Sequence, residues 1–282
     1  MKRPTAASAG TVAGASRSDP MSFLVIEATI IVVMVNSAEL VRFYDEAYSK
    51  APGESALYAR WRALGARGKA DHVIALCQSA GRRPSSTLEV GCGDGALLCE
   101  LHRRTFGGRL CGLEITQAAV AIARQRSELD SVELYDGTHV PHPDHAFELG
   151  ILSHVLEHVP DPAGLLREVA RTCDAVLVEV PLEANVSARR PAKRGRAAEV
   201  GHVQRLDRPA VHGIVKRAGL TIACELDDPL PAEVHRFFAS SGPARAVADA
   251  KWALRSAVHR VAPGLARRAF TVHYACLCLP AA

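Results

Sequence analysis

Three glycines and two carboxylates stand together in the segment Glu89-Val-Gly91-Cys-Gly93-Asp94-Gly95. The apolar residues before this segment predict a short buried strand, and the leucines after it predict a helix. A strand that turns into a helix through glycines presents backbone N–H groups and a helix N-terminus to a ligand. The segment therefore predicts a site for a nucleotide-like cofactor.

The glycine spacing alone does not identify that cofactor. Gly91-x-Gly93-x-x-Ala96 also satisfies the dinucleotide fingerprint, so an NAD-dependent oxidoreductase is one interpretation. Glu89 argues against it, because an NAD-binding strand would be apolar at that position. Asp94 is also badly placed to receive a pyrophosphate. A cofactor that carries an ammonium group and no phosphate would accept both carboxylates.

The strand Thr87–Val90 and the glycine loop after it resemble motif I of the class I S-adenosylmethionine (SAM)-dependent methyltransferases. In that family the glycine loop lies beside the methionine part of SAM. The resemblance therefore implies that the methionine end is held by Glu89, Gly91, Cys92, Gly93, Asp94 and Gly95. Cys92 is interpreted as a small space-filling residue and not as a nucleophile, since the family often has cysteine there.

Two later strand ends carry acidic residues at matching positions. Glu114 ends the predicted strand Arg109–Ile115, about 20 residues past the glycine loop, where a carboxylate can bind both ribose hydroxyls. Asp136-Gly137 ends the predicted strand Ser131–Asp136, and the resemblance implies that this aspartate accepts a hydrogen bond from the adenine amino group. In isolation, Glu114 would be an ordinary solvated carboxylate and Asp136 a turn residue. Their register with the glycine loop favours the cofactor roles.

The segment from Ser153 to Pro162 follows a fourth predicted strand, Ala146–Leu152, and resembles the V-L-E-H-x-x-D-P signature of type 11 and type 23 methyltransferases. Those families include quinone-biosynthesis enzymes. We predict Ser153 as a cofactor contact, and His154 or His158 as a general base. His158 has a second interpretation, in which it caps or packs the turn before Pro160. The resemblance covers about residues 85–182.

The same segment raises the question of a metal. In small-RNA 2′-O-methyltransferases a similar E-x-x-E-H segment joins a later histidine to bind a divalent ion. Here Glu157 and His158 match, His202 follows in Gly201-His202-Val203, and His154 replaces the first glutamate. A mixed His/Glu site suits a transition metal, so a metal-assisted, small-RNA-like enzyme is an alternative. Most type 11 and type 23 enzymes with these segments are thought to need no metal, and we predict no metal.

Composition fits a single globular enzyme. The chain has 282 residues with 48% hydrophobic content, enough for a large core, and its net charge of +4 does not imply a nucleic-acid partner. The eight cysteines mostly lie in apolar segments without zinc-ligand spacing. Reduced thiols and a cytoplasmic location follow as predictions.

Alternating strand and helix patterns predict a doubly wound, Rossmann-like α/β sheet with ligands at the strand carboxyl ends. We assign residues 85–282 to this methyltransferase domain and residues 34–84 to a helical cap. Tyr44 and Tyr48 in the cap are candidates to cover the SAM sulfonium, although an apolar stripe packed on the sheet is the preferred interpretation of either tyrosine. The segment Ala269–Leu279 is predicted as the last strand.

Two additions depart from the minimal scaffold. Residues 188–208 are rich in arginine and poor in apolar residues, and are predicted to form a mobile basic loop where substrates enter. This loop is either simply solvated or suited to an acceptor with phosphate or carboxylate. Residues 231–268 are predicted to be a helical insertion with Val247, Leu254, Val258 and Val261 on one face. That insertion packs on the sheet as a cap, covers a hydrophobic acceptor as a lid, or touches an anionic membrane peripherally.

Residues 1–33 are predicted to be a disordered extension or the product of a start codon assigned upstream of Met34. Phe23–Val35 is apolar but too short to span a bilayer. A β-rich segment is the other interpretation, and a signal peptide lacks a cleavage site.

Taken together, the motifs predict a SAM-dependent methyltransferase that acts on oxygen or nitrogen of a small-molecule acceptor. Catalysis would come mainly from holding a nucleophile in line with the methyl group. A cofactor-binding module without catalysis is a further alternative, which the intact motifs disfavour. The sequence leaves the acceptor and the oligomeric state open.

Overall fold

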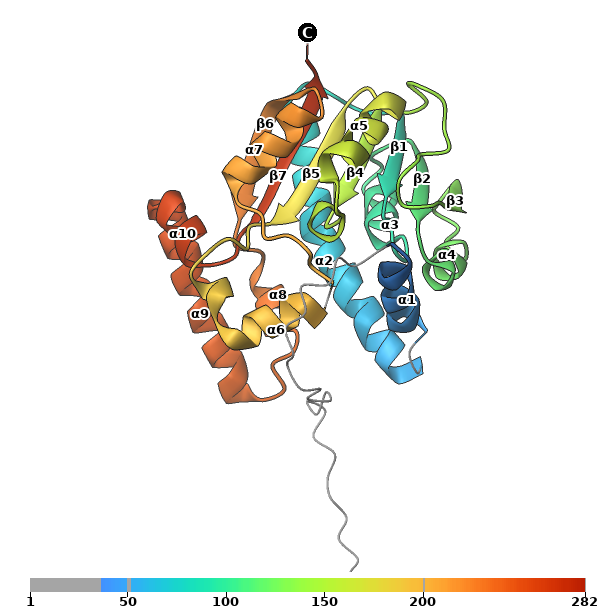
Figure 1. The fold of residues 1–282 in the computed structure, drawn as a ribbon. Coiled ribbons are helices and arrows are strands. Elements are labelled where there is room, and N and C mark those ends of the chain that lie inside the picture. The colour runs from blue at the N-terminus through green and yellow to red at the C-terminus, as the bar shows by residue number, and fades with distance from the viewer. Residues whose placement is uncertain (1–36, 50–51, 200, 282) are drawn as a thin grey trace, which may run out of the picture. The chain divides into compact units, whose positions relative to one another are not determined.

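Seven strands form one sheet in the computed structural model of the protein, in the order β3-β2-β1-β4-β5-β7-β6 (Figure 1). The structure describes residues 37–49, 52–199 and 201–281, so the predictions for residues 1–33 and for Phe23–Val35 lie outside the described residues. The strands are β1 (Ser86–Val90), β2 (Arg109–Glu114), β3 (Ser131–Leu134), β4 (Leu149–Ser153), β5 (Val176–Pro181), β6 (Leu220–Asp228) and β7 (His273–Pro280).

Strands β1 to β5 pair in parallel, and β7 runs antiparallel between β5 and β6. The sequence had not indicated this reversal. Asp228 at the end of β6 is paired with His273 at the start of β7. The residues between these strands therefore leave and return at the same edge of the sheet, where β1, β2, β4 and β5 also end.

Helices cover both faces of the sheet, which confirms the doubly wound fold. They are α1 (Ser37–Tyr48), α2 (Pro52–Ser79), α3 (Ala96–Arg103), α4 (Gln117–Ala123), α5 (Pro162–Thr172) and α7 (Arg208–Arg217), with a short 3₁₀ turn η1 at Leu156–His158. Alternate strand residues enter two different cores, as the two-residue period of a strand requires. Leu177 packs in the core with α2 and α3, whereas Val178 packs in the core with α5 and α7.

The prediction of a mobile loop over residues 188–208 is wrong. The segment contains a 3₁₀ turn, η2 (Ser187–Arg189), and a helix, α6 (Pro191–Glu199). Alanine, lysine and arginine are strong helix formers, and Pro191 stands at the first helical position, where proline is favoured. None of the side chains described in α6, those of residues 191–195, is buried, which agrees with the low apolar content.

Two predicted strand boundaries also change. The last strand begins at His273 and not at Ala269, because the preceding residues form α10 (Pro263–Ala269). Strand β3 ends at Leu134, which places Asp136 in the loop after it. All eight cysteines are free thiols, as predicted.

The insertion between β6 and β7 is helical, as predicted, with α8 (Ala232–Arg236), α9 (Gly242–Val261) and α10. Of the four residues predicted on its apolar face, Val247, Leu254 and Val261 are 52%, 64% and 84% exposed, and Val258 is half-buried. This face is therefore not packed on the sheet, and α9 meets the end of β6 through its other side, where His259 lies 3.0 Å from Asp227. Among the described helices, none is long and apolar enough to cross a membrane.

Candidate active site

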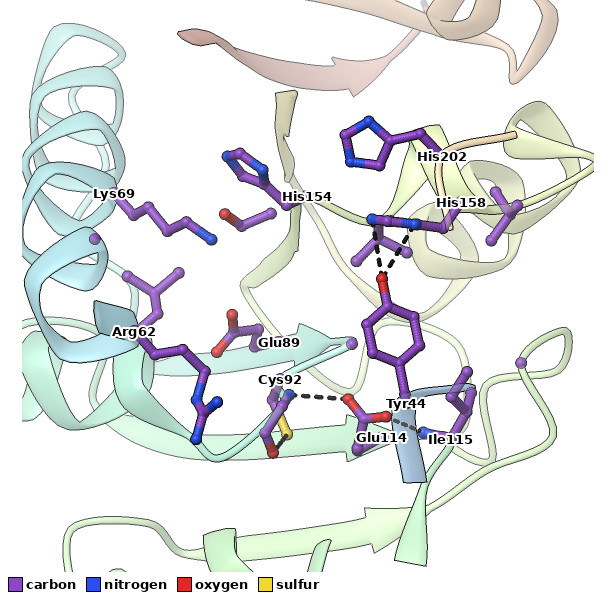
Figure 2. A pocket seen from close by; sticks show the side chains of 18 of the residues that line it. Tyr44, Arg62, Lys69, Glu89, Cys92, Glu114, Ile115, His154, His158 and His202 are labelled. Carbon is purple, nitrogen blue, oxygen red and sulfur yellow. Dashed lines mark hydrogen bonds between the residues drawn. The ribbon is translucent and has the colours of Figure 1, made fainter. Parts of the chain in front are cut away.

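A cavity of about 1050 Å³ lies at the carboxyl ends of β1, β2, β4 and β5, and residues from α1, α2 and the insertion complete its wall (Figure 2). It brings together nearly all the site residues predicted from sequence: Glu89, Gly91, Cys92, Gly93, Asp94, Glu114, Asp136, Gly137, Ser153, His154 and His158. Gly95 is not part of the wall. It precedes α3 in a left-handed conformation, with φ of 77°.

The glycine loop has no room for side chains. Gly91 and Gly93 both have positive φ, a backbone region that side chains disfavour. A Cβ on Gly91 would lie 2.6 Å from Val155 Cγ2, and a Cβ on Gly93 would collide with the Tyr48 hydroxyl. Tyr48 belongs to α1, so the N-terminal helix closes over the loop. Tyr44 and Tyr48 both line the cavity.

Glu89 carries a buried carboxylate at the end of β1. Its Oε2 atom has no hydrogen-bond partner among the described residues, and the side chain is almost fully shielded from solvent. Burial raises the pKa of Glu89 to about 8, against an opposing effect of the nearby Lys69 ammonium. A cationic group that entered the cavity would supply the missing partner and favour the charged carboxylate.

Asp94 is neutralised from within the chain. Arg62 Nε donates to Asp94 Oδ2 at 2.9 Å, and Arg126 lies 3.7 Å from the same oxygen. The Arg62 guanidinium also stacks on the Tyr48 ring at 4.7 Å. Arg62, which sequence reasoning missed, therefore ties α1 and α2 to the glycine loop.

Glu114 joins the first two strand ends. Its Oε2 atom accepts a hydrogen bond from Gly93 N at 2.9 Å, and its Oε1 atom accepts from Ile115 N at 2.8 Å and Thr116 N at 3.1 Å. A carboxylate offers about four acceptor sites, so Oε2 keeps room for a further donor. Burial raises the pKa of Glu114 despite these backbone hydrogen bonds.

Asp136 caps a turn at the edge of the cavity. Its Oδ1 atom accepts from Thr138 N and His139 N, each at 2.7 Å, which is the side-chain cap of a turn. Asp136 and Gly137 also line the cavity. Cys92 is buried, and burial raises the pKa of its thiol, which supports the space-filling interpretation.

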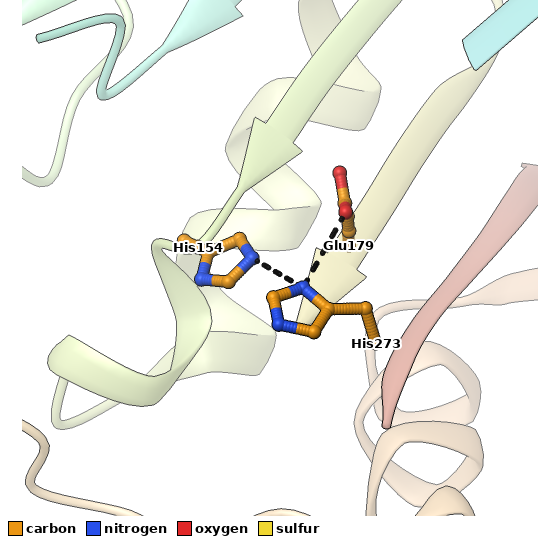
Figure 3. Close-up of side chains that lie close together, drawn as sticks. All are labelled: His154, Glu179 and His273. Atoms are coloured by element: carbon orange, nitrogen blue, oxygen red, sulfur yellow. Dashed lines mark hydrogen bonds and ion pairs between the residues drawn. The ribbon is translucent and has the colours of Figure 1, made fainter. Parts of the chain in front are cut away.

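His154 directly follows β4 and has a left-handed conformation with φ of 59°, a strained state for a residue other than glycine. Its Nε2 atom lies 3.0 Å from His273 Nδ1, and that atom lies 3.8 Å from Glu179 Oε1 (Figure 3). His154 and His273 line the cavity, and Glu179 lies behind them. Burial lowers the pKa of His154 well below its ordinary value, so this imidazole is neutral at neutral pH.

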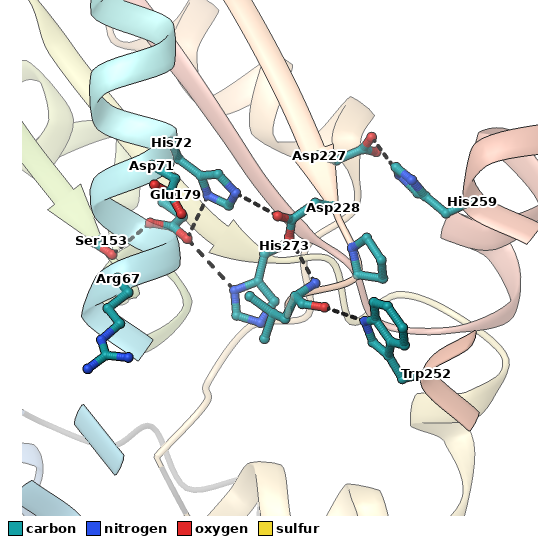
Figure 4. A network of polar contacts seen from close by, with 12 residues as sticks. Arg67, Asp71, His72, Ser153, Glu179, Asp227, Asp228, Trp252, His259 and His273 are labelled. Carbon is teal, nitrogen blue, oxygen red and sulfur yellow. Dashed lines mark hydrogen bonds and ion pairs between the residues drawn. The ribbon is translucent and has the colours of Figure 1, made fainter. Parts of the chain in front are cut away.

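Glu179 is the centre of a buried polar network (Figure 4). Ser153 Oγ donates to Glu179 Oε2 at 3.0 Å, and His72 Nδ1 lies 3.2 Å from Oε1. The other side of the His72 ring faces Asp228 at 3.0 Å. Burial alone would raise the pKa of Glu179, but the imidazoles of His273 and His72 hold it well below its ordinary value. Glu179 is therefore negatively charged, and Ser153 stabilises it by donating a hydrogen bond.

A second polar group lies on the other side of His154. Both Glu157 carboxylate oxygens are buried and have no hydrogen bond within the described chain, and Oε1 lies 3.4 Å from His154 Nδ1. Burial raises the pKa of Glu157 to about 7. His158 Nδ1 faces Gly201 O at 3.0 Å, and the His158 ring also contacts the Tyr44 hydroxyl. Burial, aided by His202, lowers the pKa of His158 to about 4.

Two sets of donor atoms in the described residues are close enough to hold a metal: His154, Glu179 and His273, and Glu157, His158 and His202. Most of these groups already have partners. Glu179 accepts from Ser153, and His202 Nδ1 lies 2.8 Å from Glu183 Oε2. Glu157 has no hydrogen bond within the described residues, but its Oε1 atom lies near His154 and His158, and burial raises its pKa to about 7.

We expect the purified protein to contain no stoichiometric metal, because Glu179, His273 and His202 already have partners within the chain. Elemental analysis by mass spectrometry measures this, with a His202→Ala variant and a His145→Ala control. His145 is an exposed histidine outside the cavity wall. Stoichiometric zinc or manganese that is lost in His202→Ala and retained in His145→Ala would contradict the metal-free prediction.

Comparisons with known proteins agree with the motifs and the fold. Residues 58–225, more than half of the chain, match the model of a methyltransferase-domain family. The ubiquinone biosynthesis O-methyltransferase of Sodalis glossinidius is 33% identical over 41% of this chain and 51% of its own length. The ajmaline N-methyltransferase of Rauvolfia serpentina is 28% identical over 32% of this chain and 33% of its own length. The chain thus spans about half the length, or less, of these curated relatives.

A solved structure supports the fold. The phosphoethanolamine N-methyltransferase 2 of Haemonchus contortus, in complex with phosphomonomethylethanolamine and S-adenosylhomocysteine, has a TM-score of 0.58 and 11% identity. The alignment covers 86% of this chain and 61% of that one. Together with the glycine loop, the acidic strand ends and the sheet order, the family match shows that this chain belongs to the class I SAM-dependent methyltransferases.

Proposed function

We propose that the protein transfers a methyl group from SAM to an oxygen or nitrogen atom of a small-molecule acceptor. The observation that carries this proposal is the unpartnered buried carboxylate of Glu89 beside the glycine loop. SAM carries an ammonium group at its methionine end, which is the cation this carboxylate lacks. The relatives that methylate oxygen and nitrogen, as their names state, support this choice of acceptor atom.

The proposed cofactor contacts follow the cavity wall. Glu89 and the loop of Gly91, Cys92 and Gly93 hold the methionine end. Glu114 holds the ribose through the free capacity of Oε2, and Asp136 with Gly137 borders the adenine. Three predicted residues would support the cofactor site indirectly. Asp94 binds Arg62, Gly95 forms the turn into α3, and Ser153 donates a hydrogen bond to Glu179. Tyr44 and Tyr48 offer aromatic faces to the sulfonium.

The remainder of the cavity is proposed to receive the acceptor. Trp61, Leu230 and Val234 contribute apolar wall, whereas His154, His202 and His273 contribute polar wall. An acceptor with a hydrophobic body and a hydroxyl or amino group fits this combination. The apolar residues would exclude water from the methyl-transfer step.

We assign the general base to His154. SAM supplies an electrophilic methyl group, and the acceptor atom must lose its proton as the new bond forms. His154 lies in the cavity wall as a neutral imidazole, and the negative charge of the nearby Glu179 carboxylate favours its protonated form. His158 is the second candidate, but both of its ring nitrogens lie within hydrogen-bond distance of other groups, Gly201 O and the Tyr44 hydroxyl, whereas among the described residues His154 Nδ1 has only Glu157 Oε1 near it, at 3.4 Å. The contacts of His158 suit an orienting role.

The assignment predicts a pH dependence. A general base must be unprotonated, and burial lowers the pKa of His154 below its ordinary value of 6.5. The neutral form is therefore fully populated at pH 7 and persists as the pH falls below 6.5. We expect kcat at saturating SAM, where the SAM ammonium keeps Glu89 charged, to stay level from pH 8 to 6.5 and to decline only at lower pH. A decline already complete at pH 7 would contradict a buried, neutral histidine base.

The proposed function is tested with SAM labelled in the methyl group. The full chain is incubated with pools of phenols, catechols, amines and short RNA duplexes, and the label in each product is counted. We expect label in a phenol, catechol or amine, without added metal. Label only in RNA, and only with a divalent ion, would favour the small-RNA-like alternative.

A further inference from the structure

The outer face of α9 is apolar and uncovered. Val247, Leu254 and Val261 recur every seven residues along this helix and are 52%, 64% and 84% exposed. Leu265 in α10 is 59% exposed. Side chains seven residues apart fall on one face of a helix, and Ala250 and Ala257, between them on that face, are also exposed. We call Val247, Leu254, Val261 and Leu265 the α9 face.

The opposite side of the helix is anchored to the rest of the protein. Trp252 Nε1 donates to Leu230 O at 3.0 Å, and His259 Nε2 lies 3.0 Å from Asp227 Oδ1 (Figure 4). These contacts fix the rotation of α9, so its apolar face is held outward by polar partners on the inner side. The same insertion supplies Leu230 and Val234 to the cavity wall.

The charge around this face is strongly positive. Between residues 243 and 269 the only acid is Asp249, which is ion-paired with Arg236. Lys251 and Arg260 are exposed on either side of the apolar residues. The cations of this stretch are Arg245, Lys251, Arg255, Arg260, Arg267 and Arg268.

We propose that the α9 face seats the protein on an anionic lipid surface. An amphipathic helix with an apolar face and flanking lysine or arginine lies in the plane of such a surface, held by apolar burial and by attraction to lipid phosphates. A second copy of this chain would bring Lys251 and Arg260 against the same cations, with no unpaired acid in residues 243–269 to offset them. The α9 face also lies outside residues 58–225, the region matched by the methyltransferase family.

Sedimentation with lipid vesicles tests this proposal on the full chain. One set of vesicles is phosphatidylcholine alone, and the other contains about 30% phosphatidylglycerol, near the anionic fraction of charged biological surfaces. We expect binding only to the anionic vesicles, and loss of most of it in about 0.5 M salt, where charges are screened. Leu254→Glu should lower binding at least roughly tenfold, because it removes apolar burial and adds a negative charge.

Leu57→Glu is the matched control, since Leu57 is a 39% exposed leucine on α2 and receives the same change of charge. It should bind the anionic vesicles like the wild type. If both variants lose vesicle binding equally, the loss comes from the change in net charge, which would overturn the proposal. A wild-type protein that binds neither kind of vesicle would also overturn it. A wild-type dimer in analytical ultracentrifugation that becomes a monomer in Leu254→Glu would assign the α9 face to a second copy instead.

Discussion

A Gly93→Val variant is expected to lose measurable SAM binding while it keeps its fold. Gly93 has a φ of 55°, and a side chain there would collide with the Tyr48 hydroxyl. Either the Tyr48 side chain or the loop must move to relieve this collision, and the valine would stand in the cavity beside the Gly93 N–H group that donates to Glu114. We expect calorimetry to show an affinity at least about 100-fold weaker, since strain and lost contacts together exceed roughly 3 kcal/mol.

Gly81→Val separates backbone strain from lost binding. Gly81 has a similar φ of 65°, but a Cβ there meets no atom within 4 Å. This control should unfold at a lower temperature because valine disfavours positive φ, and it should bind SAM like the wild type. Wild-type SAM affinity in Gly93→Val would remove the glycine loop from the proposed cofactor site.

The second large effect is expected at His154. His154→Ala should lower kcat by about 10²–10⁴, the usual contribution of general base catalysis, and leave SAM affinity nearly unchanged. The measurement is a pH–rate profile with the acceptor identified from labelled SAM. The variant should lack the decline on the acid side, because the group that titrates there has been removed.

His273→Gln and His158→Ala distinguish a base from its support. Glutamine can still donate a hydrogen bond but cannot take up a proton, so His273→Gln should lower kcat less than His154→Ala and shift the acid decline. His158→Ala should raise KM more than it lowers kcat, since His158 contacts Tyr44 and Gly201 in the cavity wall. If His158→Ala instead abolishes kcat and His154→Ala does not, His158 is the base.

Local sequence pattern was sufficient for the cofactor half of the site. Glycines that require positive φ and a charged residue within a buried strand are visible without knowledge of the fold. Glu89, Gly93 and Glu114 were therefore predicted from residues close to one another in sequence, and the structure brings them into one cavity. Parallel strands end at one edge of the sheet, so strand-end residues converge there.

The acceptor half depends on contacts between distant segments and was only partly predicted. His273 approaches Glu179 because β7 inserts antiparallel beside β5, a topology that no local pattern specifies. Glu179 did carry a usable signal, since it is an acid within the buried strand Val176–Pro181, as Glu89 is within β1. Applied to every strand, the criterion that selected Glu89 would have found it.

Helical pattern predicted the existence of α9 but not its surroundings. A seven-residue repeat of apolar residues shows that they share a face, and says nothing about what covers that face. The structure shows that this face is exposed, because Trp252 and His259 anchor the other side of the helix. For residues 188–208 the helix itself was not predicted. The low hydropathy of this segment was interpreted as a loop, although many of its residues favour a helix.

Calorimetric titration of the full chain with SAM and, separately, with NAD tests the central claim most directly. We expect one SAM per chain, and roughly 5- to 30-fold weaker binding to Glu114→Ala, since the free acceptor site on Oε2 allows one ribose hydrogen bond of about 1–2 kcal/mol. NAD should give no heat of binding. Saturable binding of NAD without binding of SAM, or SAM binding unaffected in Glu114→Ala, would contradict the proposed cofactor site.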